Sequence, residues 1–407
     1  MKAQTQNMTS GNAAKLIFFF ALPLMLGNIC QQLYTMVDTM IVGQVAGVEA
    51  LAALGSVDFL MWIVTGISTG ITQGFSILIS QHYGAGNGVA LRKVIAHSYR
   101  LTAITAVLVF ALSQLLASAA LTGLHTPQNI IGMALLYLRI IFCGIPFTTA
   151  YNMFACELRA IGNSKAPLTA MLIASLINIV LDLLFVGLLG FGVGAAALAT
   201  IISQFSSAFL CMLRLMRTKD VYQVQISQIR FHRGMLGQII GIGLPSGMQN
   251  SIISFANIIV QTNINKFGVM AVAGCGVYSK IEGFAFLPIT CFAMSLTTFI
   301  GQNLGAKQYD RAKKGAYFGI TCSTLLADVV GVIVFFTIPQ LAAAFNNEAQ
   351  VVEFATRQAH IEAFFYCFLA FSHCIAGIMR GAGKSTVPMF VMLASWCIIR
   401  ITYITVT

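Results

Sequence analysis

Long apolar runs separated by short polar segments make up most of the chain. A transmembrane helix needs about 20 mostly apolar residues, and these runs are continuous rather than alternating as in membrane-spanning strands. The pattern therefore predicts an all-α membrane protein. Eleven helices are expected, at 16–42, 53–81, 96–120, 130–156, 167–190, 192–216, 236–265, 270–303, 315–343, 352–380 and 387–407.

The composition supports this interpretation. Of the 407 residues, 58% are hydrophobic and only 9% are charged, whereas a soluble domain carries roughly 25% charged residues. So few charges do not cover a surface that faces water. The polar start, MKAQTQNMTSGN, carries little charge and the apolar run after it is long, so we expect the first helix to be retained rather than cleaved as a signal peptide.

The net charge of +11 follows the topology of the chain rather than a nucleic-acid surface. The loops on one side of the predicted helices carry the basic residues, and the opposite loops hold only Lys266. Because cytoplasmic loops are enriched in Lys and Arg, we expect a multi-pass protein of the cell membrane with its N-terminus in the cytoplasm. The basic loop residues are Lys2, Lys15, Arg92, Lys93, Arg100, Arg159, Lys165, Arg214, Arg217, Lys219, Arg230, Arg233, Lys307, Arg311, Lys313, Lys314, Arg380 and Lys384.

The two halves of the chain contain similar segments, separated by one constant offset in residue number. The matched pairs are AGVEALAALG (46–55) with FGVMAVAGCG (267–276), ISQHYGA (79–85) with IGQNLGA (300–306), and RAIGNSKAP (159–167) with RGAGKSTVP (380–388). We call this the internal repeat. An even number of helices per repeat predicts two parallel six-helix halves. We expect an N-lobe at 1–216, a cytoplasmic linker at 217–235 and a C-lobe at 236–407.

The sixth helix should recur near 413–437, beyond Thr407, so the second repeat is expected to be truncated and to lack its twelfth helix.

The motifs of enzymes and metal sites are weak in this sequence. The ten cysteines are scattered without metal-ligand spacing. The segment GAGKST at 381–386 imitates a phosphate loop, but Ile378 stands where that motif needs glycine. We therefore expect no enzymatic activity and no cofactor.

Polar residues inside the predicted helices share one layer of the first half. Asp182 and Asn178 are four residues apart and therefore share a helix face. Counted from the expected helix ends, Asp38, Tyr137, Asp182 and Thr200 lie about 6–12 Å below the same outer surface. A charge at such a depth is costly and marks a functional site. Oxygen ligands suit a small cation, and two coupled acids also suit a shared proton.

Several segments resemble the multidrug and toxic compound extrusion (MATE) transporters. They are LPLMLGNICQQLYTMVDTMIVGQVAGVEALAALG, GISTGITQGFSILISQHYGAGN, ELRAIGNSKAP, GLPSGMQN and MRGAGKSTVP. The resemblance implies two six-helix lobes that rock about a central cleft. It also implies export of bulky, often cationic, organic compounds against inward movement of Na⁺ or H⁺, with no further cofactor.

The similarity to the DinF-like branch of this family implies a coupling-cation site in the N-lobe. The matching residues are Asp38, Tyr137, Asn152, Asn178, Asp182 and Thr200. Depth counting does not place Asn152 with the others, because it lies far below the start of its helix at residue 130. Gly144 and Pro146 are expected to kink that helix.

The second half lacks equivalent acids. Ile259 and Tyr403 stand at the positions equivalent to Asp38 and Asp182, so coupling is expected in the first half alone. The NorM branch instead carries a Glu and an Asp in this half, at positions that fall near Ser254 and Leu369 here.

Gln31, Lys280 and Glu282 are predicted to line the substrate cleft. For Lys280 and Glu282, a simple position at the membrane interface is the alternative. As partners we expect small organic compounds and the lipid bilayer, no nucleic acid, and a monomeric chain.

Two other functions remain as alternatives. A flippase for lipid-linked precursors, known in the same superfamily, is expected to have a basic central cleft. The basic residues here are assigned to loops, apart from Arg139, Lys280, Arg357 and Arg400. A channel or a sensory membrane protein is the second alternative, and the off-axis acids and the repeat without ring symmetry disfavour a pore.

Overall fold

The computed structural model describes residues 6–42, 45, 48–124, 126, 128–217, 233–345 and 348–406, and all regular elements among them are helical. The first half contains α1 (Ala13–Ile41), α2 (Val48–Gly84), α3 (Gly88–Gly123), α4 (Ile131–Cys143), α5 (Ile145–Ala160), α6 (Lys165–Asp182) and α7 (Val193–Arg217). The second half contains α8 (Arg233–Ile264), α9 (Val269–Gly305), α10 (Tyr309–Phe345), α11 (Ala349–Glu362), α12 (Tyr366–Gly381), α13 (Thr386–Met392) and α14 (Arg400–Val406). The linker expected at 217–235 falls mostly outside the described residues.

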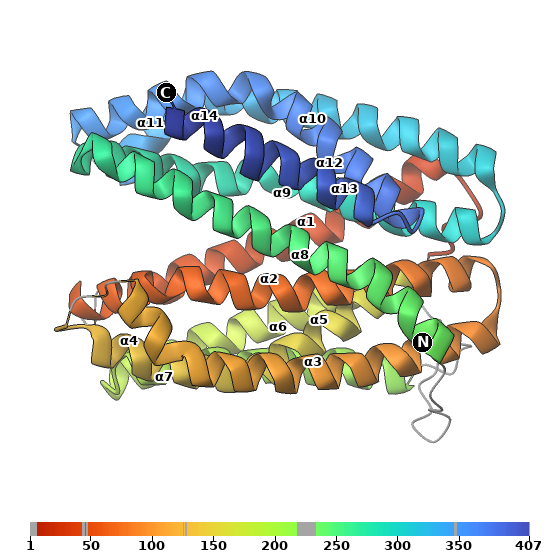
Figure 1. Ribbon diagram of the computed structural model, residues 1–407, viewed down its shortest axis with the longest axis horizontal. Coiled ribbons are helices and arrows are strands. Elements are labelled where there is room, and N and C mark those ends of the chain that lie inside the picture. Colours follow the sequence, from red (N-terminus) through yellow and green to blue (C-terminus); the bar gives the residue numbers. More distant parts are fainter. Residues whose placement is uncertain are drawn as a thin grey trace.

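The helices form two layers (Figure 1). One layer holds α2 to α7, the other holds α8 to α14, and α1 runs between them, packed against both α6 and α9. Between the layers α2 packs along α8 and also contacts α9. The loops that follow α2 and α9 lie together at the right of Figure 1. We call this the basic end, because Arg92 and Lys93 lie near the start of α3 and Lys313 and Lys314 near the start of α10.

The helix boundaries follow the internal repeat. Helices α2 and α9 each have 37 residues, and their first residues, Val48 and Val269, are separated by the offset of the repeat. The last residues of α5 and α12, Ala160 and Gly381, are separated by the same offset. The repeat therefore describes the length and order of the helices, as expected for two copies of one unit.

The outer surface is apolar. Side chains such as Leu115, Leu188 and Phe336 are 78%, 80% and 71% exposed, which only a lipid environment tolerates on this scale. Within the described residues, nine helical segments are long and apolar enough to span a membrane, and ten if α4 and α5 are one bent span. Helix α8, the remaining expected span, has 32 residues but is not among them.

Two helix irregularities lie near the predicted site. Helices α4 and α5 meet at Gly144 with a bend of 44°, and Pro146 occupies the first turn of α5, as expected for a break at this position. Helix α6 continues after Asp182 as a π-helical segment, Leu183–Leu188. Such segments are frequent at functional sites.

Glycines allow α2 and α8 to approach closely across the two layers. A Cβ atom on Gly70 would overlap the backbone of Gly247, and one on Gly74 would overlap the backbone of Gly243. Small residues at such positions let helix backbones pack in direct contact within a membrane. This contact is part of the interface between the two halves.

Candidate functional site

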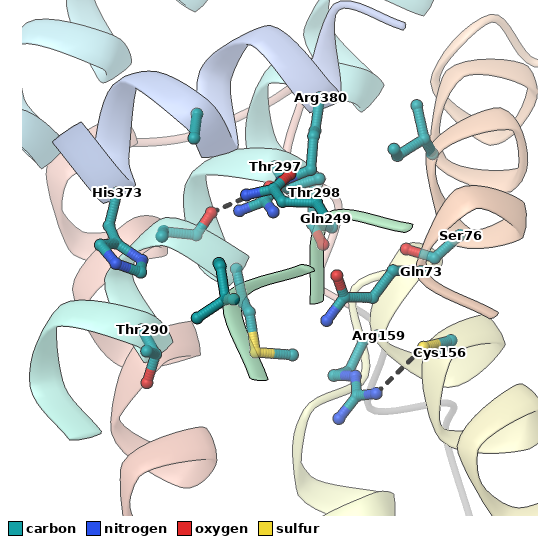
Figure 2. A pocket seen from close by; sticks show the side chains of 15 residues that line it. Gln73, Ser76, Cys156, Arg159, Gln249, Thr290, Thr297, Thr298, His373 and Arg380 are labelled. Carbon is teal, nitrogen blue, oxygen red and sulfur yellow. Dashed lines mark hydrogen bonds between the residues drawn. The ribbon is translucent and has the colours of Figure 1, made fainter. Parts of the chain in front are cut away.

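A cavity of ≈ 170 Å³ lies between the two halves and is lined by residues of both. We call it the central cavity (Figure 2). Arg159 from α5 and Arg380 from α12 lie on opposite sides of it in that view, with Gln73 and Gln249 between them. The other lining residues are Ser76, Ile77, Cys156, Ile253, Thr290, Ala293, Met294, Thr297, Thr298, His373 and Ala376.

A second cavity, of ≈ 390 Å³, is lined by residues of the first half and by Met294 of α9, and we call it the first-half cavity. It shares Gln73, Arg159 and Met294 with the central cavity, so the two are adjacent. Together they fall in the range of about 300–1,000 Å³ typical of small-molecule sites. No aspartate or glutamate lines either cavity, and all of their lining residues are described.

The predicted acids Asp38 and Asp182 lie next to each other. Their carboxyl groups are close enough to interact electrostatically, although they come from α1 and α6. Asp182 is 0% exposed and Asp38 is 9% exposed. No basic side chain among the described residues acts electrostatically on Asp182. Two adjacent buried carboxyls are stable when they share a proton or a bound cation.

Asn178 completes this group. It lies one turn before Asp182 on α6, is 0% exposed, and its amide has no hydrogen-bond partner among the described residues. Buried amides are normally satisfied, so this one is available to a ligand. Asp38, Asn178 and Asp182 together offer carboxyl and amide oxygens, the donors that a small hard cation prefers.

Tyr34 connects the acid pair to the first-half cavity. Tyr34 lines that cavity, lies near Gln31 and Gln204, and is within electrostatic range of Asp38. The carboxyl groups themselves do not line either cavity. A change of charge at Asp38 therefore alters the electrostatic potential at Tyr34, which is part of the cavity wall.

The other predicted coupling residues are divided between two places. Asn152 and Thr200 line the first-half cavity, and the Thr200 hydroxyl also donates to the Ala196 carbonyl at 3.1 Å. Tyr137 is 8% exposed and packs in the apolar cluster that contains Val42 and Val186, which lie one turn beyond the two acids. The bend at Gly144 brings Asn152 to the cavity, which depth counting along a straight helix did not predict.

The predicted cleft residues are also divided. Gln31 lines the first-half cavity, whereas Lys280 is exposed and lines neither cavity. Glu282 interacts electrostatically with Glu362 from α11, forming a second acid pair that the sequence did not indicate. Arg400 acts electrostatically on both glutamates and donates to the Asn257 side chain at 3.0 Å.

The assignment of Arg159 and Arg380 to loops was wrong. Both belong to the last turns of membrane-spanning helices and line the central cavity. Hydropathy alone fixes helix ends only to within a few residues, and both residues stand at such ends. The internal repeat contained the missing signal, because it pairs the two arginines at equal spacing.

Reciprocal hydrogen bonds close the basic end. Gln81 Nε2 donates to the Gly381 carbonyl at 2.9 Å, and Gln302 Nε2 donates to the Ala160 carbonyl at 2.7 Å. Donors and acceptors are both related by the internal repeat, so each half clasps the other in the same way. We call these two contacts the glutamine clasp.

The N-terminal segment covers the clasp. The Gln6 amide donates to the Gly162 carbonyl of the first half, and the Met8 amide donates to Gln302 Oε1 of the second, both at 3.1 Å. Asn303 and Arg311 donate to the Met8 carbonyl. Residues 6–8 are therefore fixed to both halves where they meet.

Two stacked halves of membrane-spanning helices, with a cavity between them closed at one end, are the features of a membrane transporter. The MatE family model matches residues 23–184 and 245–405, one segment in each half. The chain belongs to this family of transporters, which are not enzymes.

Two curated relatives cover most of the chain. A protein named "Probable multidrug resistance protein YoeA" from Bacillus subtilis is 27% identical over 400 residues, covering 96% of this chain and 86% of its own length. A protein named "FAD transporter" from Shewanella oneidensis is 24% identical over 354 residues, covering 85% of this chain and 77% of its own. The names of the two relatives thus differ, although both align with most of this chain.

The fold matches a solved structure. It is described as "Outward-facing conformation of a multidrug resistance MATE family transporter of the MOP superfamily", with a TM-score of 0.94 and 21% sequence identity. The match covers 100% of this chain and 91% of that chain. The two-lobe architecture expected from the sequence is thereby confirmed.

Proposed function

We propose that this protein is a cation-coupled antiporter that exports organic compounds by alternating access, with its coupling site at Asp38 and Asp182. The N-lobe would comprise residues 1–216 and the C-lobe residues 236–407, joined by the segment 217–235. The basic end, and with it the N-terminus, would face the cytoplasm, in line with the positive-inside rule.

The observation that carries this proposal is the buried acid pair. Asp38 and Asp182 are adjacent and almost fully buried, and no described basic side chain acts on Asp182, which suits exchangeable binding of Na⁺ or H⁺. Tyr34 stands between this pair and the first-half cavity, so the charge of the pair can alter the cavity wall. An ion and an organic compound would then bind to different conformations of the two lobes.

The cargo is an organic compound on the basis of the relatives, whose names include multidrug export and FAD transport. Flipping of lipid-linked precursors is the second candidate, because Arg159 and Arg380 give the central cavity the basic character that this function needs. Coupling separates the two candidates. The acid pair gives an antiporter a binding site for its driving ion, whereas a flippase that follows the lipid gradient does not need one.

The test is transport in proteoliposomes under imposed gradients. Ethidium and FAD are used as probes, and Na⁺ and H⁺ gradients are imposed separately. We expect gradient-driven movement of at least one probe, lost in Asp182→Asn and Asp38→Asn. Asp328→Asn, at an exposed acid of α10, is the matched control and should transport normally. Movement of neither probe under either gradient, or full activity of Asp182→Asn, would contradict the proposal.

A further inference from the structure

Two arginines face the central cavity without an acidic partner among the described residues. The Arg159 guanidinium donates to the Cys156 thiol at 3.1 Å, and its Nε has no hydrogen-bond partner within the described chain. Arg380 forms no ion pair with any described residue. Both arginines are half-buried, and a cation that is partly withdrawn from water without a counter-ion favours an anion beside it in the cavity.

The two arginines are equivalent by the internal repeat, one in each half. Ser76 and Thr297, which also line the cavity, are equivalent in the same way. The cavity therefore offers similar donors from two opposite sides, which matches a group whose negative charge is spread over several oxygens. Guanidinium groups bind phosphate and carboxylate through two parallel hydrogen bonds.

The remaining polar residues of the wall are compatible with such a group. Gln73 and Gln249 lie between the arginines in Figure 2, and Thr290 and Thr298 add hydroxyl groups. His373 is the one other ionisable group besides Cys156 in this wall, all of whose residues are described, and it adds no negative charge. A cationic compound would meet two positive charges here and no carboxylate.

We infer that Arg159 and Arg380 form a binding subsite for the phosphate or carboxylate group of an anionic cargo. The first-half cavity, which shares Arg159, takes the uncharged body of the same molecule. This inference rests on the proposed export function, whose cargo class it names. It also explains why a transporter would keep one arginine in each moving half, because an anion held by both draws the two halves together.

The test uses a pair of ligands that differ by a single phosphate, flavin mononucleotide and riboflavin. Binding to the purified full chain in nanodiscs is followed by flavin fluorescence. The wild-type protein should bind flavin mononucleotide more tightly than riboflavin. Arg159→Gln and Arg380→Gln should each weaken binding of the phosphate-bearing ligand by roughly ten- to hundred-fold and leave riboflavin unchanged. Arg139→Gln, at an exposed arginine, is the matched control.

Further measurements test whether the variants are folded and whether the bound anion is free or lipid-linked. Inorganic pyrophosphate should raise the unfolding temperature of the wild type and of Asp182→Asn, but not of Arg380→Gln. Arg380→Lys should retain part of the effect, which a simple loss of fold would not. Farnesyl pyrophosphate that displaces the flavin better than pyrophosphate does would identify a lipid-linked anion, and equal displacement a free one.

Equal binding of the two flavins by the wild type, or discrimination that survives both glutamine variants, would overturn the inference. The inference would also be overturned if neither flavin binds and pyrophosphate does not raise the unfolding temperature. Binding does not require coupling. A protein that binds the anion but shows no gradient-driven transport would therefore refute the proposed function and not this subsite.

Discussion

Gln302, in the second half, donates a hydrogen bond of 2.7 Å to the carbonyl of Ala160, in the first half. Its repeat equivalent, Gln81, donates to Gly381, the equivalent of Ala160, at 2.9 Å. Together these bonds hold the two halves against each other at the basic end, beside the central cavity. The proposed alternating access requires that both bonds break when this end opens.

The double substitution Gln81→Ala with Gln302→Ala should therefore favour opening. A hydrogen bond contributes about 1 kcal/mol, so the loss of two should shift the equilibrium by roughly 30-fold. The measurement is the rate at which a membrane-impermeant thiol reagent labels Cys156, the buried cysteine of the central cavity, in a background without the other cysteines. Gln114→Ala, in α3, is the control, and an unchanged rate would show that the clasp does not hold the gate.

The acid pair should behave as one functional unit. Asp182→Asn keeps the size and polarity of the side chain but removes its charge, so gradient-driven transport should fall to near background while folding is kept. Asp38→Asn should do the same, and the double variant should be no worse than either single one, because both residues act on one ion. If the fold-loss of transport in the double variant equals the product of the two single losses, the two residues act at independent sites.

The second acid pair is expected to be structural. Glu282 and Glu362 interact with Arg400, and Gln358 donates to Glu362 at 2.9 Å, so these acids have compensating partners that Asp182 lacks among the described residues. Glu282→Gln should therefore lower the unfolding temperature but leave gradient-driven transport intact. Loss of coupling in Glu282→Gln with an unchanged unfolding temperature would show that the second half also carries the ion.

The contact between α2 and α8 should be intolerant of larger residues. Gly70→Ala would place a Cβ atom in the backbone of Gly247, and overpacking of this kind costs about 1–3 kcal/mol. Gly276→Ala in α9 meets nothing within 4 Å and is the matched control, which should be neutral or slightly stabilising. Thermal unfolding in detergent measures both, and equal stability of the two variants would mean that the helices separate at little cost.

The fold could be predicted from the sequence because the features that determine it follow the order of residues along the chain. Apolar run length predicted the helices, and the internal repeat predicted the paired lengths of α2 and α9. The depths of Asp38 and Asp182 predicted only that both lie in one layer below the same surface. Their adjacency depends on how α1 packs against α6. Their role as an ion site stays a prediction.

The parts that the sequence did not reveal depend on helix direction and rotation. Asn152 reaches the first-half cavity through the 44° bend at Gly144, which sequence position could suggest but not orient. Glu362 meets Glu282 because α9 and α11 turn these faces toward each other. Arg159 stands at a helix end, where apolar content does not separate a loop from a cavity wall.

The segment at residues 6–8 has a consequence for observing the transport cycle. Gln6 is bound to Gly162 of one half and Met8 to Gln302 of the other, so separation of the halves at this end releases one of the two amides to water. The rate of hydrogen–deuterium exchange at those amides therefore reports how often the gate opens. The exchange of two backbone amide protons thus measures the frequency of opening in the unmodified chain, without an attached dye or a substitution.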